Sequence, residues 1–293
     1  MKISLDPRAR IVISMAVFGT IGVFTRNIQV TSGELALYRA VLAAALISVY
    51  LAVTKQHIDF KTIKKELPLL LLSGVAMGIN WILLFQAYRY TTISAATLSY
   101  YFAPVIVTAV CPFLFKEKMT AKQIVCVIMS TVGIIMITGI NDIGQSSRDF
   151  IGIMFGLGAA VFYATVILLN KFIKGVSGIH RTLLQFIAAI ITLTPYVAVT
   201  SGVTLYKMTT VGWVCLLVVG LIHTGITYCL YFSSIEGLTG QKAAILSYID
   251  PLVAVIISVF ILGEKMTAMQ AAGGVLILGF TLWNEITPSK SKQ

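Results

Sequence analysis

A stretch of twenty residues occurs twice in this chain of 293 residues. The first copy runs from Pro104 to Gln123 and the second from Pro251 to Gln270, an offset of 147 residues, which is half of the chain. In both copies a glutamate (Glu117 and Glu264) stands thirteen residues after the proline and opens the run Glu-Lys-Met-Thr-Ala-x-Gln. A self-match at a fixed offset indicates an internal repeat. The chain is therefore expected to consist of two similar halves.

The composition places both halves in a membrane. The sequence is 58% apolar and 11% charged, whereas a soluble protein is about 45–50% apolar and about 25% charged. A spanning helix needs about 20 mostly apolar residues, and a barrel strand would alternate over about 10 residues instead. An all-α membrane protein with ten spans is expected, at Arg10 to Phe24, Gly33 to Val53, Leu67 to Tyr88, Ile93 to Phe115, Ala121 to Gly139, Phe150 to Phe172, Thr182 to Thr200, Val211 to Ser234, Gln241 to Gly263 and Ala268 to Trp283.

The positive residues predict how the bundle is oriented. With the N-terminus inside, sixteen of the 22 Lys and Arg fall in inside segments, five fall in outside segments and Arg39 falls within a span. Lys and Arg accumulate in cytoplasmic loops, so both termini are expected in the cytoplasm. The net charge of +11 is then an orientation signal and needs no nucleic-acid partner. The five outside residues are Arg26, Arg89, Arg148, Lys207 and Lys265.

The repeat covers nearly the whole chain. The run Leu98-Ser99-Tyr100 recurs as Leu246-Ser247-Tyr248, and the expected halves are residues 1–146 and 147–293, with a linker from Asn141 to Asp149. Because each half crosses the membrane an odd number of times, the second half enters from the opposite side and the repeats are inverted. Inverted repeats are typical of secondary transporters, in which the two halves can exchange conformations.

The duplicated glutamates cannot share a site in this topology, since Glu117 falls inside and Glu264 outside. In both copies a threonine (Thr120 and Thr267) is followed three residues later by Gln, which predicts a capping box at the start of a new helix. This pattern favours a turn that joins two helices over a role in substrate binding.

Two prolines and one carboxylate stand near the middle of equivalent spans. Pro104 and Pro251 are expected to kink their helices and free a backbone carbonyl, either to line a cavity or only for packing. Asp250 directly precedes Pro251, and its counterpart in the other half is the neutral Ala103. Ionisable residues within a membrane are costly and are functional candidates. Asp250 is therefore expected to bind substrate or a proton, with a polar cap on the kinked helix as the alternative.

Two further ionisable side chains fall within spans. His223 suits proton exchange, but a core histidine bonded to a carbonyl oxygen is the favoured interpretation. Arg39 could bind a carboxylate, pair with Glu34, or extend its head group to the interface. For both residues, these alternatives stay open at this stage.

Aromatic and amide side chains gather at the same level of the membrane. A cavity with aromatic faces and few polar groups suits a small amphiphilic solute, whereas each such residue alone could belong to helix packing or to an interfacial belt. The cavity candidates are Asn80, Trp81, Gln86, Tyr100, Tyr101, Tyr163, Asn170, Tyr228 and Tyr248.

Other chemistry has little support in the sequence. There is no Gly-x-x-x-x-Gly-Lys-Ser/Thr, His-Glu-x-x-His, Cys-x-x-Cys or Gly-x-Ser-x-Gly motif. The four cysteines stand singly in apolar segments and are interpreted as small hydrophobic residues. No catalytic residue, metal or cofactor is expected. The basic N-terminus has no small-x-small cleavage site, so the first span is expected to be retained.

Several motifs resemble a known family. The run Ala87-Tyr88-Arg89-Tyr90-Thr91, the pairs Ala95-Ala96 and Arg39-Ala40, and Lys116-Glu117-Lys118 are similar to the EamA repeat of the drug/metabolite transporter superfamily. The second repeat matches through Gly263-Glu264-Lys265 and departs at Glu236-Gly237 and at Asp250. The resemblance implies a ten-helix carrier of the inner membrane, often an exporter of amino acids or related metabolites. It also implies a cavity lined by the third, fourth, eighth and ninth helices.

The resulting hypothesis is an alternating-access transporter of a small organic solute. Export is favoured, and proton coupling rests on Asp250 and His223. The alternatives are a sugar or nucleotide-sugar type carrier, an importer, and a membrane-embedded enzyme or sensor. The expected partners are the solute and the lipid bilayer, with a monomer and a homodimer both open.

Overall fold

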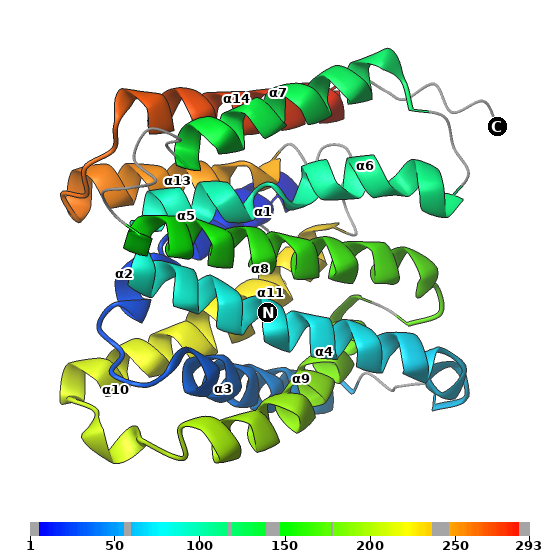
Figure 1. The fold of residues 1–293 in the computed structure, drawn as a ribbon. Coiled ribbons are helices and arrows are strands. Elements are labelled where there is room, and N and C mark those ends of the chain that lie inside the picture. The colour runs from blue at the N-terminus through cyan, green and yellow to red at the C-terminus, as the bar shows by residue number, and fades with distance from the viewer. Residues whose placement is uncertain are drawn as a thin grey trace.

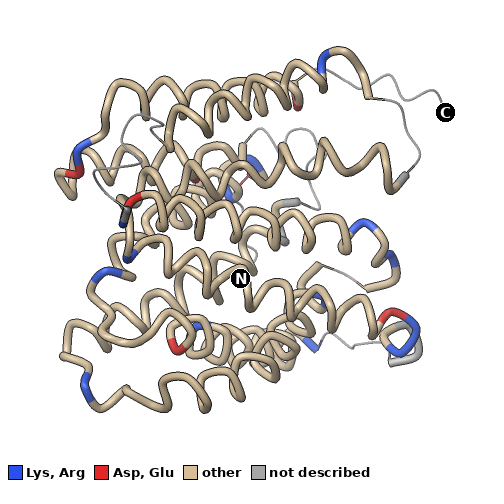
Figure 2. The backbone as a smooth tube through the Cα atoms, viewed as in Figure 1, with Lys and Arg blue, Asp and Glu red and all other residues tan. Residues whose placement is uncertain are grey.

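The computed structural model describes residues 6–55, 60–115, 119–138, 147–176, 178–235 and 246–286. Within these ranges every regular element is a helix and none is a strand. The helices run along one common direction, with their connections at the two ends of the bundle (Figure 1). Most Lys and Arg lie near those two ends, as Figure 2 shows, and the middle of the bundle is nearly free of charge.

The first half of the chain forms five helical passages. They consist of α1 (Pro7–Gly19) with α2 (Ile21–Thr25), α3 (Ser32–Val53), α4 (Phe60–Tyr90), α5 (Ile93–Tyr100) with α6 (Ala103–Phe115), and α7 (Ala121–Thr138). The second half contains α8 (Ser147–Phe172), α9 (Gly178–Thr200), the short 3-10 helix η2 (Leu205–Lys207), α10 (Thr210–Leu217), the π-helical segment η3 (Val218–Ile226), α11 (Thr227–Ile235), α13 (Ile249–Ile256), the π-helical η4 (Ile257–Ile261) and α14 (Ala268–Ile286).

Eight of these passages are long and apolar enough to cross a membrane. They agree with the first eight expected spans to within four residues at either end. The expected ninth span starts at Gln241, outside the described residues, and its described apolar part, Ile249–Ile261, is shorter. The tenth corresponds to α14. One boundary is corrected: α8 begins at Ser147, so the last three residues of the expected linker are helical.

The predicted capping boxes are confirmed in both copies of the repeat. At α7 the Thr120 N–H donates to Gln123 Oε1 (2.8 Å) and the Gln123 N–H donates to Thr120 Oγ1 (3.2 Å). At α14 the same two bonds join Thr267 and Gln270, at 3.0 and 3.1 Å. Each duplicated turn therefore starts a new helix. Glu117 itself lies outside the described residues.

The last helices of the two halves, α7 and α14, pack against each other along one edge of the bundle (Figure 1). Their backbones approach so closely that a Cβ atom on Gly133 would lie 2.7 Å from the Gly273 carbonyl oxygen. A Cβ atom on Gly273 would lie 2.5 Å from the Gly133 carbonyl oxygen. Small residues allow such contacts between membrane helices, so both positions require glycine.

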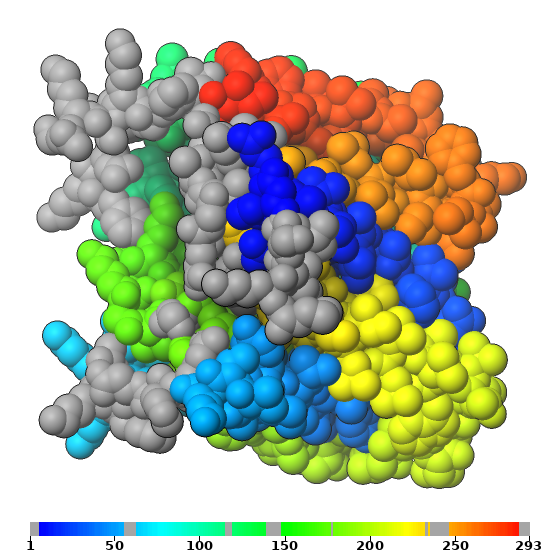
Figure 3. All heavy atoms as spheres, turned by 180° about the vertical axis from the view of Figure 1, so that it is seen from behind, coloured from blue at the N-terminus to red at the C-terminus, as the bar shows by residue number. Residues whose placement is uncertain are grey.

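The remaining helices surround the middle of the bundle. On the side away from α7 and α14, α3 packs against α4, α9 and η3 in the largest buried apolar cluster. Seen from behind, α1 lies between α11 and α13 (Figure 3). A Cβ atom on Gly19 would lie 2.6 Å from the Asp250 carbonyl oxygen, so α1 rests directly on the start of α13. This contact brings α1 to the central cavity.

Candidate functional site

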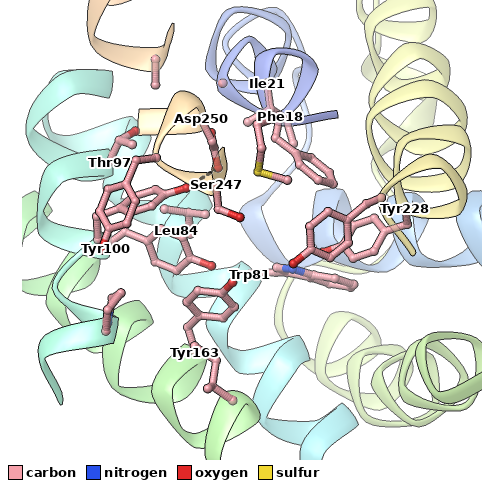
Figure 4. A pocket seen from close by; sticks show the side chains of 18 of the residues that line it. Phe18, Ile21, Trp81, Leu84, Thr97, Tyr100, Tyr163, Tyr228, Ser247 and Asp250 are labelled. Carbon is pink, nitrogen blue, oxygen red and sulfur yellow. Dashed lines mark hydrogen bonds between the residues drawn. The ribbon is translucent and has the colours of Figure 1, made fainter. Parts of the chain in front are cut away.

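A cavity of about 290 Å³ lies between helices of both halves. Figure 4 shows side chains from the two halves converging on it. Nine of the fourteen residues singled out in the sequence line it, namely Arg39, Trp81, Tyr100, Tyr101, Pro104, Tyr163, Tyr228, Tyr248 and Asp250. The resemblance implied walls from the third, fourth, eighth and ninth helices. In the structure α1, α3, α8 and α14 also contribute.

Both mid-span prolines follow a break between two helical segments. α5 ends at Tyr100, and α6 begins at Ala103 with Pro104 as its second residue. In the second half, α13 begins at Ile249 with Pro251 as its third residue. A proline in the first turn of a helix costs little, because its missing N–H would have no partner within the helix. The sequence predicted a kink within a continuous helix, whereas the structure has a new helix start at each site.

Asp250 presents its carboxylate to the cavity from the first turn of α13. The Tyr101 hydroxyl, from the break in the other half, donates to Asp250 Oδ2 at 2.5 Å (Figure 4). The N-terminus of a helix stabilises a negative charge. In the described part of the chain, no basic side chain lies within ion-pair distance of Asp250. The cavity thus contains a carboxylate whose protein partner is a tyrosine.

Arg39 supplies a positive charge to the same cavity from α3. Its guanidinium carbon lies 4.5 Å from the centroid of the Trp81 ring, and its Nε donates to Thr224 Oγ1 at 3.1 Å. The side chain is only 4% exposed, so it does not extend to the interface. It does not pair with Glu34 either, because Glu34 accepts hydrogen bonds from the threonines at 31 and 204. The stacking on Trp81 is a cation–π contact that holds Arg39 at the cavity wall.

Aromatic rings form most of the remaining wall. Tyr100 stacks on Tyr163 with ring centroids 5.1 Å apart and an interplanar angle of 25°. Tyr101 meets the edge of Tyr100 at 5.8 Å, and Phe18 meets the edge of Tyr228 at 5.2 Å. Such offset and edge-to-face pairs stabilise one another. The cavity therefore offers apolar faces, tyrosine hydroxyls, and one basic and two acidic side chains.

Five of the residues singled out in the sequence do not line the cavity. The three amide side chains bond to neighbouring helices instead. The Asn80 side chain donates to the Ala159 carbonyl oxygen (2.6 Å), while Gln86 accepts from Ser32 (2.7 Å) and Asn170 accepts from Gln185 (2.7 Å). Pro251 is buried in α13 and does not line the cavity.

His223 is the fifth of these residues. Its Nε2 lies 2.8 Å from Thr20 Oγ1, and its Nδ1 lies 3.3 Å from the Val218 carbonyl oxygen. Its ring packs edge-on against Phe24 at 5.0 Å. Both ring nitrogens are therefore occupied, which fits the alternative of a core histidine bonded to a carbonyl oxygen.

Several lining residues were not singled out from the sequence. Tyr88 lies seven residues after Trp81, and Tyr231 lies three after Tyr228, so helical spacing places each on the same face as a selected aromatic. Glu285 lies on α14, and its counterpart in the other half is Thr138. The asymmetry that identified Asp250 would also have identified Glu285. The other lining residues with polar or aromatic groups are Phe18, Thr97 and Ser247.

The end of the bundle that carries Glu264 is held together by one polar cluster. Glu264 Oε2 accepts from the Ile93 N–H, the first of α5, at 2.9 Å, and Glu264 also bonds to Ser258 and forms an ion pair with Arg26. Ser94 donates to Ser258 at 2.6 Å. We call Arg26, Ile93, Ser94, Ser258 and Glu264 the Glu264 cluster.

The backbone allows Glu264 to reach this position. Gly263 has a φ of +65°, which glycine adopts readily, in the turn between η4 and α14. Burial lowers the pKa of the Arg26 guanidinium, which nevertheless stays cationic. The Glu264 side chain, 7% exposed, thus links Arg26 after α2 with the start of α5, while the turn that carries it connects η4 to α14.

In the described ranges, no three His, Cys, Asp or Glu side chains come together in a way that could hold a metal ion. The four cysteines are all free thiols. Two of them, Cys126 and Cys215, are buried within the bundle. They pack there as small apolar side chains.

A multi-span helical bundle built from a repeat, with a central cavity of this kind, defines a membrane transporter. Residues 10–139 and 150–284 each match the model of the EamA-like transporter family. The chain belongs to this family, within the drug/metabolite transporter superfamily. It is a multi-pass integral membrane protein.

Similar proteins agree with this assignment. The uncharacterized transporter YxxF of Bacillus subtilis is 30% identical over 92% of this chain and 86% of its own length. A Salmonella typhimurium protein described as a probable amino-acid metabolite efflux pump is 25% identical over 75% of this chain and 77% of its own. A crystal structure with a TM-score of 0.64 covers 94% of this chain and 95% of its own, at 15% identity, and shows the same fold.

Proposed function

We propose that this protein exports an amino acid or a related metabolite across the cytoplasmic membrane by alternating access. The observation that carries the proposal is the presence of Arg39 and Asp250 in the cavity wall, where Glu285 is a second acidic side chain. Asp250 and Arg39 both line it, and among the described residues neither has an ion-pair partner. A solute with an ammonium group and a carboxylate would supply both missing counter-charges, since a charge-assisted hydrogen bond is stronger than a neutral one.

The aromatic walls support a solute with an apolar part. Tyr100 and Tyr163 present stacked rings on one side, and Trp81 and Tyr228 line the cavity as well (Figure 4). A cavity of about 290 Å³ is at the lower end of the range of about 300–1,000 Å³ for small-molecule sites. This size favours a single amino acid over a nucleotide sugar.

The proposed orientation defines the two faces of the transporter. The loop charges favour both termini in the cytoplasm, which would put the Glu264 cluster at the outer face. The printed description of the Salmonella relative, an efflux pump for amino-acid metabolites, supports export. With the outer end tied together by the Glu264 cluster, we assign the structure to a state that receives solute from the cytoplasm.

Proton coupling is the third part of the proposal. A carboxylate within a membrane span is a typical site of proton exchange, and Asp250 can hold either a proton or the ammonium group of the solute. Because both compete for one carboxylate, proton entry would release the solute. His223 has no part in this proposal, since both of its ring nitrogens are occupied.

The test is flux in proteoliposomes. A thermal-shift screen of amino acids on the purified chain identifies the solute, because a ligand at 100 times its Kd stabilises the folded state by about 2.7 kcal/mol. Asp250→Asn is then expected to abolish the dependence of flux on a pH gradient. Asp149→Asn, which changes an exposed carboxylate in the first turn of α8, is the control and should keep that dependence.

Two results would contradict the proposal. Unchanged pH coupling in Asp250→Asn would remove this residue from the mechanism. A purified chain that converts a solute chemically without moving it would favour a membrane-embedded enzyme.

A further inference from the structure

A second pocket, of about 380 Å³, lies at the end of the bundle that carries Glu264. Three arginines from distant parts of the sequence line it: Arg26 after α2, Arg89 near the end of α4 and Arg148 at the start of α8. No acidic side chain of the described residues lines this pocket. We call it the arginine pocket.

The charge of the arginine pocket is largely uncompensated. Arg26 pairs with Glu264, but Arg89 donates to the Val30 carbonyl oxygen and Arg148 donates to the Arg89 carbonyl oxygen at 3.1 Å. Neutral carbonyl oxygens leave both of these guanidinium charges in place, and Glu34, which acts electrostatically on Arg89, does not lie within ion-pair distance of it. Because only one of the three arginines has an ion-pair partner among the described residues and converging positive charges repel one another, a bound anion would stabilise the arrangement.

The convergence of three arginines is unusual because the outside segments of this chain hold few positive residues. The loop-charge assignment places only five positive residues outside, and three of the five line this one pocket. Lys and Arg are depleted from outside segments. Their concentration around one pocket therefore calls for a reason other than orientation, and the planar guanidinium group is suited to binding a carboxylate through two parallel hydrogen bonds.

The rest of the arginine pocket is apolar and adjoins the central cavity. Ile28, Leu35, Phe85 and Tyr88 complete its lining together with Thr25. Tyr88 lines the central cavity as well, where its hydroxyl lies 3.4 Å from Thr97 Oγ1. Phe85 lies under the guanidinium of Arg39 at 5.2 Å. The two sites thus share one aromatic wall.

We propose that the arginine pocket is a second binding site, specific for a carboxylate attached to a small apolar or aromatic body. The carboxylate lies between the guanidinium groups of Arg89 and Arg148, and the apolar body packs on Phe85 and Tyr88. The proposal concerns binding alone and does not depend on transport, so failure of the proposed function would leave it intact.

The test uses benzoate, a carboxylate on an aromatic ring, with the full chain purified in detergent that contains no anionic lipid. Isothermal titration should show binding of benzoate and much weaker binding of benzamide, its neutral analogue. Arg148→Gln should weaken benzoate binding by about tenfold, because it removes a hydrogen bond to a charged group, and Arg148→Lys should recover part of the loss. Added salt should weaken binding, since the site is exposed to solvent.

Two controls separate the arginine pocket from other sites. Lys207→Gln removes another of the five outside charges, one that does not line the pocket, and should leave benzoate binding unchanged. Arg39→Gln changes the central cavity and should also leave it unchanged. The proposal is overturned if benzoate does not bind the wild-type chain at millimolar concentration, if benzamide binds equally well, if inorganic phosphate binds in preference to benzoate, or if Arg39→Gln removes the binding while Arg148→Gln does not.

Discussion

The two halves of the chain have the same helix break and use it differently. In the first half, Ala103 precedes the proline, is fully buried and packs with Ala160 and Ala164 of α8. In the second half, Asp250 precedes the proline and lines the central cavity. The hydrogen-bond donor to Asp250 is Tyr101, which comes from the break in the first half.

This difference shows that the helix break and the cavity carboxylate depend on different residues. The proline fixes where a new helix starts, and it does so in both copies. The residue before it decides whether that start contacts another helix or the cavity. A duplicated chain can therefore keep its architecture and gain a functional group by one substitution in one half.

The largest expected effect comes from making the halves alike. Ala103→Asp would place a carboxylate among alanine side chains, at a cost of about 2.5–3.5 kcal/mol for Asp at the centre of a membrane helix. The purified variant should melt at a clearly lower temperature than the wild type. Ala103→Ser, similar in backbone preference but uncharged, is the control. Equal melting temperatures for Ala103→Asp and the wild type would show that the two positions are interchangeable.

A smaller effect is expected at the duplicated turn of the second half. Glu264→Gln removes the charge that pairs with Arg26 and that accepts the first N–H of α5. A loss of about 1–2 kcal/mol would change the ratio of closed to open protein by a factor of about 5–30. The end of the bundle that carries Glu264, which is the outer end in the proposed orientation, should open more often. The measurement is the reaction of Thr97→Cys with an impermeant maleimide added to intact cells, after replacement of the four native cysteines.

The neighbouring charge provides the control for this experiment. Lys265→Gln changes an exposed residue of the same turn and should react at the wild-type rate. Glu117→Gln is the equivalent change in the first half, on the opposite face in the proposed orientation, and should not accelerate labelling from outside. A wild-type rate in Glu264→Gln would contradict a closing role for the Glu264 cluster.

The smallest effect is expected at the hydrogen bond between Tyr101 and Asp250, which joins the two halves. Tyr101→Phe keeps the aromatic ring and removes one hydrogen bond to Asp250, a loss of about 1 kcal/mol. The KM for the transported solute should rise by about fivefold, with little change in kcat, because the carboxylate loses a group that orients it. Tyr90→Phe, whose ring packs on Phe155 away from the cavity, is the control. A KM within error of the wild type would mean that the hydroxyl does not orient Asp250.

The sequence predicted the features that depend on local or periodic patterns. The eight long spans follow from apolar length, and the capping boxes of Thr120 and Thr267 follow from two residues three positions apart. Asp250 attracted attention because its repeat partner is an alanine. Each of these signals is contained in a short segment or in the comparison of two copies.

The direction of polar side chains could not be predicted in the same way. Asn80, Gln86 and Asn170 were expected at the cavity, but each bonds to a neighbouring helix. An amide within a membrane satisfies its hydrogen bonds wherever a partner lies, and that partner is distant in the sequence. The arginine pocket was missed for a similar reason, because its three arginines meet only after α2, α4 and α8 are placed.

The glycine contact between α7 and α14 limits how such a transporter can move. Where two backbones touch, there is no layer of side chains that could repack and allow sliding. These two helices belong to different halves, so the halves are fastened together along this edge. In the proposed alternating-access cycle, access would then change by bending at the helix breaks at Tyr101 and Tyr248. The two broken helices would then bend while the contact between α7 and α14 stays fixed, and the two halves would not rotate against each other as rigid bodies.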